Sequence, residues 1–249
     1  IMVRDNGPGI VKAQVPKIFG KLLYGSKFHA MKMSRGQQGI GISAAGMYAQ
    51  ITTGKPVSII SRTGVGKPAY QCQIHLDLVK NKPEIVKEEE VDWDQEHGTE
   101  VAMEIEARYQ KGTHSVDGYL YETVLANPHL KLNYEAPGAE RVVYERATEI
   151  MPVQPKEIKP HPYGVELGLL LKMTRDTSRP DLRTFLAKEF SRVSPNVADE
   201  ILKTANLSGA TRPGRLSRDD VELLHRAITQ TRIRNPPTNC ISPIGEGLI

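Results

Sequence analysis

The chain has 249 residues, of which 39% are hydrophobic and 25% are charged, with a formal net charge of +4. This composition is that of an ordinary globular protein, and the length suits one large domain or one medium and one small domain. No hydrophobic run is long enough to span a membrane and no signal segment opens the sequence, so we expect a cytoplasmic protein without a membrane partner. Cys72 and Cys240 are far apart and lack metal-binding spacing, so neither a zinc site nor a disulfide is expected.

Residues 1–4 are typical of the end of a buried strand, and they run directly into Asp5-Asn6-Gly7. A strand needs neighbours to pair its backbone groups, so a domain seldom begins with one. We therefore expect the sequence to begin inside a domain.

Residues 1–150 combine helix and strand signals. A helix is expected over 16–24, and a glycine-rich loop at 36–41 leads into a second helix of small residues. Alternating apolar residues then predict strands, in the order 57–62, 69–76, 84–87 and 100–105, with a hairpin turn at 64–68. A helix over 115–125 and a hairpin of 130–134 with 141–144 follow. Strands flanked by helices predict an α+β fold, with helices on one face of a mixed sheet.

The second part of the chain is predicted to be helical. Four prolines between positions 152 and 162 predict an extended linker, placed at 151–163. Apolar residues at helical spacing then predict three helices that form a small bundle over 164–238. Ser194 is expected to begin the second of these helices, and Ser217 with Asp220 resembles a capping box at the start of the third. Basic residues in this part are equally compatible with solvated helix faces and with a DNA-facing patch: Arg212, Arg215, Arg218, Arg226, Arg232 and Arg234.

Two motifs have the residue types needed to bind a nucleotide. In Asp5-Asn6-Gly7-Pro8-Gly9, a carboxylate at the end of a strand precedes a tight glycine turn. A carboxylate accepts hydrogen bonds, so it suits an amine donor such as the exocyclic amino group of adenine, although a plain turn is the alternative. The second motif, Gly36-Gln37-Gln38-Gly39-Ile40-Gly41, opens a helix, where backbone N–H groups converge on phosphate oxygens.

Two other phosphate motifs fit less well. A Walker loop needs a hydroxyl after its lysine, but Pro68 follows Gly66-Lys67. Residues 39–44 satisfy the dinucleotide fingerprint, yet that fingerprint directly follows a buried strand, and residues 33–38 are polar and loop-like.

Taken together, the two motifs resemble the signature of the GHKL ATPases, which include gyrase-type topoisomerases, Hsp90 chaperones, MutL repair proteins and sensor histidine kinases. Further stretches are similar to the B subunits of type IIB topoisomerases, the topoisomerase VI family: residues 19–27, 34–41, 55–56, 97–99, 159–164 and 241–249. The resemblance implies a two-layer GHKL (Bergerat) sandwich over 1–150 that lacks its N-terminal part. It also implies a helix–two-turns–helix domain at 164–238 and the start of a transducer domain at 239–249.

The resemblance also implies roles for individual residues. Asp5 would bind adenine, with Gly7 and Gly9 forming the turn and Thr99 as a hydroxyl partner. Ser26 and Lys27 would lie at the nucleotide. The phosphates would be cradled by Gly36, Gln37, Gln38, Gly39, Ile40, Gly41, Ile42 and Ser43. Read without the resemblance, Lys27 is a solvated surface lysine, and Thr99 is a β-branched residue at the start of a strand.

ATP and Mg²⁺ are the implied cofactors. The family's general-base glutamate and magnesium-binding asparagine are expected before Ile1 and its switch lysine after Ile249, so no catalytic or metal-binding residue is expected within the chain. Some relatives have a lysine at position 43, where this chain has serine, so no charge-based role is assigned there.

The implied activity is ATP-gated passage of one DNA duplex through another, which relaxes or decatenates DNA. The implied partners are double-stranded DNA, the A subunit of topoisomerase VI, which cleaves DNA, and a second B subunit that dimerises when ATP binds. This stretch alone is expected to hydrolyse no ATP. The alternatives are a non-hydrolysing nucleotide- or DNA-binding scaffold and another GHKL ATPase. A histidine kinase is disfavoured by the helical module and by the lack of a phosphoacceptor helix.

Overall fold

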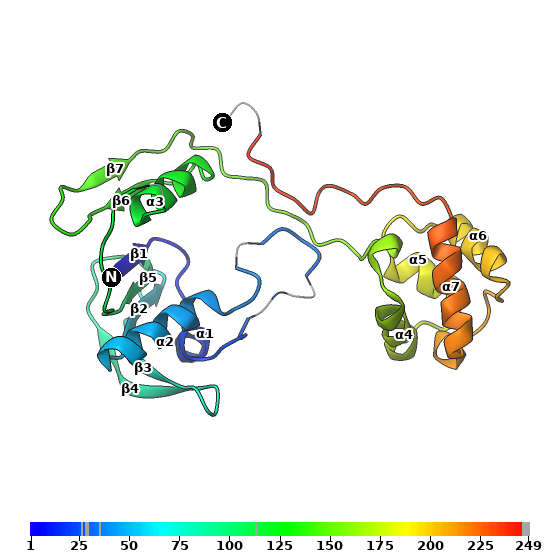
Figure 1. Ribbon diagram of the computed structural model, residues 1–249, viewed down its shortest axis with the longest axis horizontal. Coiled ribbons are helices and arrows are strands. Elements are labelled where there is room, and N and C mark those ends of the chain that lie inside the picture. The colour runs from blue at the N-terminus through cyan, green and yellow to red at the C-terminus, as the bar shows by residue number, and fades with distance from the viewer. Residues whose placement is uncertain (26, 28–29, 35, 113, 246–249) are drawn as a thin grey trace. The chain divides into compact units, whose positions relative to one another are not determined.

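The computed structural model describes residues 1–25, 27, 30–34, 36–112 and 114–245. The chain divides into two compact units, Ile1–His29 with Ser34–Arg146, and Ala30–Met33 with Ala147–Ile249. Within the first unit, Figure 1 shows the helices α1 and α2 beside a sheet, whereas the labelled elements of the second unit are all helices. In the described part of the chain, no helix is long and apolar enough to cross a membrane.

A five-stranded sheet organises the first unit, with strand order β1-β5-β2-β3-β4. Its strands are β1 (Met2–Asp5), β2 (Val57–Thr63), β3 (Ala69–Asp77), β4 (Lys82–Val91) and β5 (His97–Ala102). The four predicted strands are confirmed within a few residues. The predicted mixed sheet is wrong, because every pairing of these strands is antiparallel. Alternation along a strand indicates which side chains are buried but not which neighbour pairs with it.

Two helices, α1 (Val15–Gly20) and α2 (Gly41–Thr53), pack on one face of this sheet. Ile59 and Cys72 are fully buried on that face, where they meet Val15 of α1 in the core. α2 approaches closely at Gly46, where an added Cβ would lie 3.0 Å from the side chain of Val57. The helices and the sheet therefore form two layers.

The helix predicted over 16–24 is shorter than expected. α1 ends at Gly20, Lys21 has extended backbone angles, and Leu23 has a φ of 63°. A left-handed residue cannot continue a right-handed helix, so residues 21–24 form a turn instead. The short 3-10 helix η1 (Lys12–Gln14) precedes α1.

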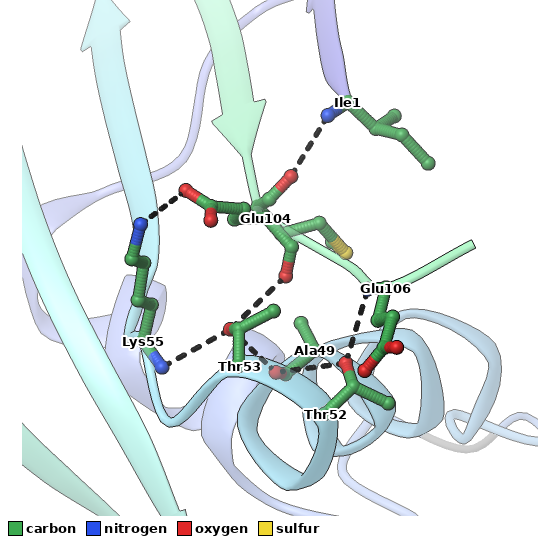
Figure 2. A network of polar contacts seen from close by, with 8 residues as sticks. Ile1, Ala49, Thr52, Thr53, Lys55, Glu104 and Glu106 are labelled. Carbon is green, nitrogen blue, oxygen red and sulfur yellow. Dashed lines mark hydrogen bonds and ion pairs between the residues drawn. The ribbon is translucent and has the colours of Figure 1, made fainter.

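The C-terminal end of α2 is attached to the segment that follows β5 (Figure 2). The hydroxyl of Thr53 donates to Ala49 O and Glu104 O at 2.8 and 3.4 Å, and Glu106 N–H donates to the hydroxyl of Thr52. Lys55 forms an ion pair of 2.6 Å with the carboxylate of Glu104. These bonds fix the end of α2, and with it the direction in which the helix crosses the sheet.

The rest of the first unit is the helix α3 (Val116–Leu125) and the hairpin of β6 (Leu132–Tyr134) with β7 (Val142–Tyr144). The predicted helix and hairpin are both confirmed. Ser115 caps α3 by accepting the N–H of Gly118. The hydroxyl of Tyr109 donates to Asp117 on α3 and hydrogen-bonds to the hydroxyl of Tyr134 on β6, which connects the helix to the hairpin.

Strand β1 differs from the expectation of a buried strand. Met2 and Val3 are 63% and 64% exposed, and the strand pairs with β5 at one end of the sheet order. The apolar residues of β1 therefore lack, among the described residues, the helical cover that the central strands have.

In its described residues, the second unit contains four α-helices around one core, where three were predicted. They are α4 (Leu167–Asp176), α5 (Leu182–Glu189), α6 (Pro195–Ala205) and α7 (Arg218–Gln230), with the short 3-10 helices η2 (Pro162–Gly164) and η3 (Pro213–Arg215). Leu170, Phe185, Ile201 and Leu224, one from each helix, are fully buried together. The helix missing from the prediction is α4, whose N-cap residue Glu166 makes no side-chain capping bond, so the sequence carries no start signal for it.

The two ends of this helical bundle are held together. The hydroxyl of Tyr163 donates to Thr231 O and accepts the N–H of Ile233 at 3.0 Å. Nε2 of His161 lies 2.9 Å from Arg234 O. The motif at 159–164 thus connects the segment that enters the bundle to the segment that leaves it.

Candidate nucleotide-binding site

Asp5 ends β1 with one carboxylate oxygen anchored. Its Oδ1 accepts the N–H of Gly7 at 2.8 Å and the N–H of Thr99 at 3.2 Å. The side chain is exposed, and Oδ2 has no partner among the described residues. A carboxylate held in this way is fixed in orientation and has one oxygen free to accept a hydrogen bond from a ligand.

Three side chains of this region lie in one row across the sheet. Asp5 of β1 is paired with Thr99 of β5, and Thr99 is paired with Ser61 of β2. Directly paired residues of antiparallel strands point to the same face, here the face covered by α1 and α2. The predicted pair Asp5 and Thr99 is thus adjacent.

Ser61 was not singled out from the sequence. It is 2% exposed, and its hydroxyl lies 3.2 Å from Oγ1 of Thr99. The signal that would have found it is a polar residue at an inward position of β2, where the alternation of Val57 and Ile59 calls for another apolar side chain.

Two glycines let the loops around Asp5 approach closely. Gly9 has a φ of +67°, and an added Cβ would lie 2.0 Å from Arg62 O. Gly98 has a φ of +138°, and its Cβ would lie 2.1 Å from Asp5 O. Any other residue would push these backbones apart. The turn is held further by His97, whose Nδ1 lies 2.9 Å from Gly7 O.

The glycine loop, residues 36–41, closes back on the residues that follow α1. Leu23 N–H donates to Gly39 O at 2.9 Å, and Lys27 N–H donates to Gln37 O at 2.8 Å. Gly39 has a φ of +68°, and an added Cβ would lie 2.5 Å from Tyr24 O, so glycine is required there. Gln37, Gln38 and Gly41 are exposed.

α2 begins where the glycine loop ends, at Gly41. The N-cap residue Ile40 makes no side-chain capping bond, and the first helical bond is that from Ala44 N–H to Ile40 O. The amides that precede Ala44 in the first turn are therefore not used within the helix, and the helix dipole adds positive potential at this end. Backbone donors of this kind suit phosphate oxygens.

The predicted residues of this region differ in what they can offer a ligand. Ser43 is fully buried, and its hydroxyl lies 3.2 Å from Lys21 O and 3.4 Å from Ile18 O, so its side chain is not available to a phosphate. Ile40 and Ile42 are 37% and 38% exposed, and Lys27 is exposed. Ser26 lies outside the described residues.

Ala30–Met33, which precede the glycine loop in the sequence, belong to the second unit. Ile158 N–H donates to Met31 O at 3.1 Å, and Met33 N–H donates to Cys240 O at 2.7 Å. Lys156 N–H also donates to Asn239 O at 2.8 Å. The segment that enters the helical bundle and the segment that leaves it therefore both contact this stretch.

Two titratable side chains near this row, and the search for metal ligands, bear on other chemistry at the site. Burial raises the pKa of the Cys72 thiol, which disfavours the reactive thiolate. Burial and a hydrogen bond to Glu88 also raise the pKa of the Tyr70 phenol, the next member of the row after Ser61. In the part of the chain that the structure describes, no three His, Cys, Asp or Glu residues are grouped to hold a metal.

Several known proteins similar to this chain carry the same name. No protein-family model matches the chain. It is 49% identical to the B subunit of type 2 DNA topoisomerase 6 from Methanococcoides burtonii and 47% identical to that from Archaeoglobus fulgidus, over 100% of this chain in both cases. It is 47% identical to the B subunit from Natronomonas pharaonis over 81% of this chain.

The chain spans only part of these relatives, covering 40% of the one from Methanococcoides burtonii and 42% of the one from Archaeoglobus fulgidus. The matches nevertheless include the whole chain, with both the sheet of the first unit and the helices of the second. The chain belongs to the family of type 2 DNA topoisomerase 6 B subunits and corresponds to a part of such a subunit.

Proposed function

We propose that this chain is the part of a type II topoisomerase B subunit that binds ATP, in a GHKL (Bergerat) fold, and that connects the nucleotide to a helix–two-turns–helix domain. Asp5 accepts a hydrogen bond from the amino group of adenine, with Thr99 beside it. The glycine loop and the first turn of α2 bind the phosphates. Mg²⁺ accompanies the nucleotide and is held by its phosphates.

The observation that carries the proposal is the state of the Asp5 carboxylate. Oδ1 is anchored by Gly7 N–H and Thr99 N–H, while Oδ2 has no partner among the described residues. The carboxylate lies at the end of β1, where the close approach of the neighbouring loops requires glycine at positions 9 and 98. A carboxylate that only accepts hydrogen bonds matches an amino group. The start of α2, which has no side-chain cap, supplies backbone N–H donors, and these suit phosphate oxygens.

The test is Asp5→Asn in the intact subunit that contains this chain. A hydrogen bond to a charged group contributes about 1.5–3 kcal/mol, so ATP binding is expected to weaken about 10- to 100-fold. Titration calorimetry with ATP measures this, and Asp219→Asn, an exposed aspartate in the first turn of α7, is the control. Unchanged affinity in Asp5→Asn would refute the assignment. The 249-residue chain alone is expected to show no ATP turnover, and measurable turnover would contradict that part of the proposal.

Within the whole protein, we propose that ATP binding drives association with a second B subunit, and that the A subunit cleaves the DNA. The helical bundle has exposed arginines at Arg212, Arg215 and Arg218, and Arg218 pairs with Glu222 at 3.2 Å. We propose that these arginines contact DNA phosphates.

Replacing these three arginines with glutamine tests the DNA contact. If each binds one phosphate, the slope of log K against log salt for duplex DNA becomes less steep by about 2.7. The matched control replaces Lys80, Lys82 and Lys87 of the first unit, which changes the net charge equally. Equal slopes in the two variants would show that the arginines are solvated only.

A further inference from the structure

Ser61 makes three polar contacts inside the row that contains Asp5 and Thr99. Its hydroxyl oxygen accepts the N–H of Ile10 at 2.7 Å. The same oxygen lies 3.0 Å from Gly98 O and 3.2 Å from Oγ1 of Thr99. Only 2% of the residue is exposed, so water does not replace these partners.

The hydrogen available to Ser61 determines the direction of each bond. A serine hydroxyl has one hydrogen to donate and two lone pairs that accept. Ile10 N–H occupies one lone pair of the Ser61 oxygen. Gly98 O can only accept, and it is closer to the Ser61 oxygen than Oγ1 of Thr99 is, so it receives the single Ser61 hydrogen. The other lone pair is then left for the hydroxyl of Thr99, which donates to Ser61. The Thr99 oxygen consequently has lone pairs but no hydrogen to offer a ligand.

We propose that Ser61 is a positioning residue that fixes the Thr99 hydroxyl as a hydrogen-bond acceptor, so that the site discriminates a 6-amino purine from a 6-oxo purine. This inference rests on the proposed ATP-binding function and deepens it. The carboxylate of Asp5 also only accepts, and its Oδ1 is bonded to Thr99 N–H. Acceptors on two directly paired residues match an amino group and oppose the carbonyl oxygen of a 6-oxo purine.

Without Ser61, this restriction on Thr99 is lost. In Ser61→Ala the Thr99 hydroxyl is free to rotate and can donate to a 6-oxo group, which the native arrangement prevents. One neutral hydrogen bond contributes about a fivefold change in affinity. The ratio of the dissociation constant of inosine triphosphate to that of ATP is therefore expected to fall about fivefold in Ser61→Ala.

Titration calorimetry measures this ratio, with ATP and with inosine triphosphate, whose 6-oxo group replaces the amino group, each titrated into the intact subunit. The matched control is Ser58→Ala, on the same strand but on the opposite face of the sheet, and it is expected to leave the ratio unchanged. If Ser61 serves only to hold the fold, Ser61→Ala weakens both nucleotides by the same factor, and the unchanged ratio overturns the proposal.

Two further variants keep the test decisive. Ser61→Cys is nearly the same size and its thiol is a weak donor and acceptor, so it is expected to lower the ratio even if Ser61→Ala does not fold. Thr99→Val removes the acceptor itself, and adding Ser61→Ala to it is expected to change the ratio no further. An additional change of fivefold in the double variant would contradict the dependence of Ser61 on Thr99.

Failure of this inference is distinguishable from failure of the proposed function. If neither nucleotide binds to the native protein, or both bind equally, ATP recognition by Asp5 and Thr99 is wrong and Ser61 has nothing to position. If the native protein prefers ATP, Asp5→Asn weakens ATP binding and Ser61→Ala leaves the ratio intact, only the role of Ser61 is wrong.

Discussion

The two units differ in how completely they bury their apolar residues. In the helical unit, Phe185 and Leu224 are fully buried, and three of its four α-helices begin with a capping side chain that binds the backbone. In the first unit, Val15 of α1 and Ile59 of β2 are equally buried where the helices pack on the sheet, but Ile1 and Val3 are 70% and 64% exposed. The helix α3 has no buried residue among those described.

The difference reflects how far apart in sequence the contacting residues are. In the second unit, α5 packs on α6 and α6 on α7, so these helices contact the next helix in the chain, although α4 also packs on α7. The candidate nucleotide site instead depends on strands far apart in sequence, since Thr99 N–H reaches Asp5 across 94 positions. The site therefore lies in the unit whose cover is less complete among the described residues.

The largest expected effect is that of Leu224→Ala in the helical unit. Removing a fully buried leucine side chain from a packed core costs about 2–5 kcal/mol of unfolding free energy. Urea denaturation of the 249-residue chain, followed by far-UV circular dichroism, measures this loss. Trp93, the only tryptophan, lies in the first unit and reports separately on that unit by fluorescence.

Leu223→Ala is the matched control for Leu224→Ala, because Leu223 is the neighbouring leucine on α7 and is 47% exposed. It is expected to change the unfolding free energy by less than about 1 kcal/mol. If the Trp93 transition moves as far as the dichroism transition in Leu224→Ala, the two units unfold together, and the contrast between them does not extend to their stability.

How much was predictable from the sequence also differs between the units. The starts of α6 and α7 were predicted correctly, because Ser194 and Ser217 bind amides three residues away, within reach of a local pattern. The motif residues Asp5 and Thr99 were also singled out, and the structure brings them together. Ser61 was missed because its hydroxyl partner Thr99 is 38 positions away; the alternation of β2 marks Ser61 as inward, but strand pairing of that kind leaves no local sign of its partner.

A smaller effect is expected for Ser217→Ala at the start of α7. Ser217 and Asp220 form a capping box in which each side chain binds the other's backbone N–H. Loss of a serine N-cap costs about 0.5–2 kcal/mol of unfolding free energy at neutral pH. Urea denaturation of Ser217→Ala measures it, and Ser208→Ala, in the turn after α6, is the control.

This effect is also expected to depend on pH. Hydrogen bonds from the Ser217 hydroxyl and then from its backbone N–H lower the pKa of Asp220. A carboxyl whose pKa is lower in the folded state stabilises the fold above its unfolded pKa of about 3.9 and loses that contribution as pH falls through the folded pKa. The difference between the native chain and Ser217→Ala should therefore shrink below about pH 4. A difference that stays constant down to about pH 2 would exclude Asp220 as the partner.

The smallest effect is expected for Val3→Ser in β1. This variant tests whether the exposed apolar residues of the first unit contribute little to its stability. Val3 shares a strand face with Asp5 two residues on, and it is paired with Val101 of β5. Because the side chain is 64% exposed, little apolar area returns to water when it becomes serine, and the unfolding free energy should change by less than about 0.5 kcal/mol. Trp93 fluorescence during urea denaturation of the 249-residue chain measures this.

Ile59→Ser is the matched contrast, because Ile59 is fully buried on β2, and it should lower the unfolding free energy several times more. A loss in Val3→Ser comparable to that in Ile59→Ser would mean that the face of β1 is covered in solution, and the contrast between the two units would then disappear.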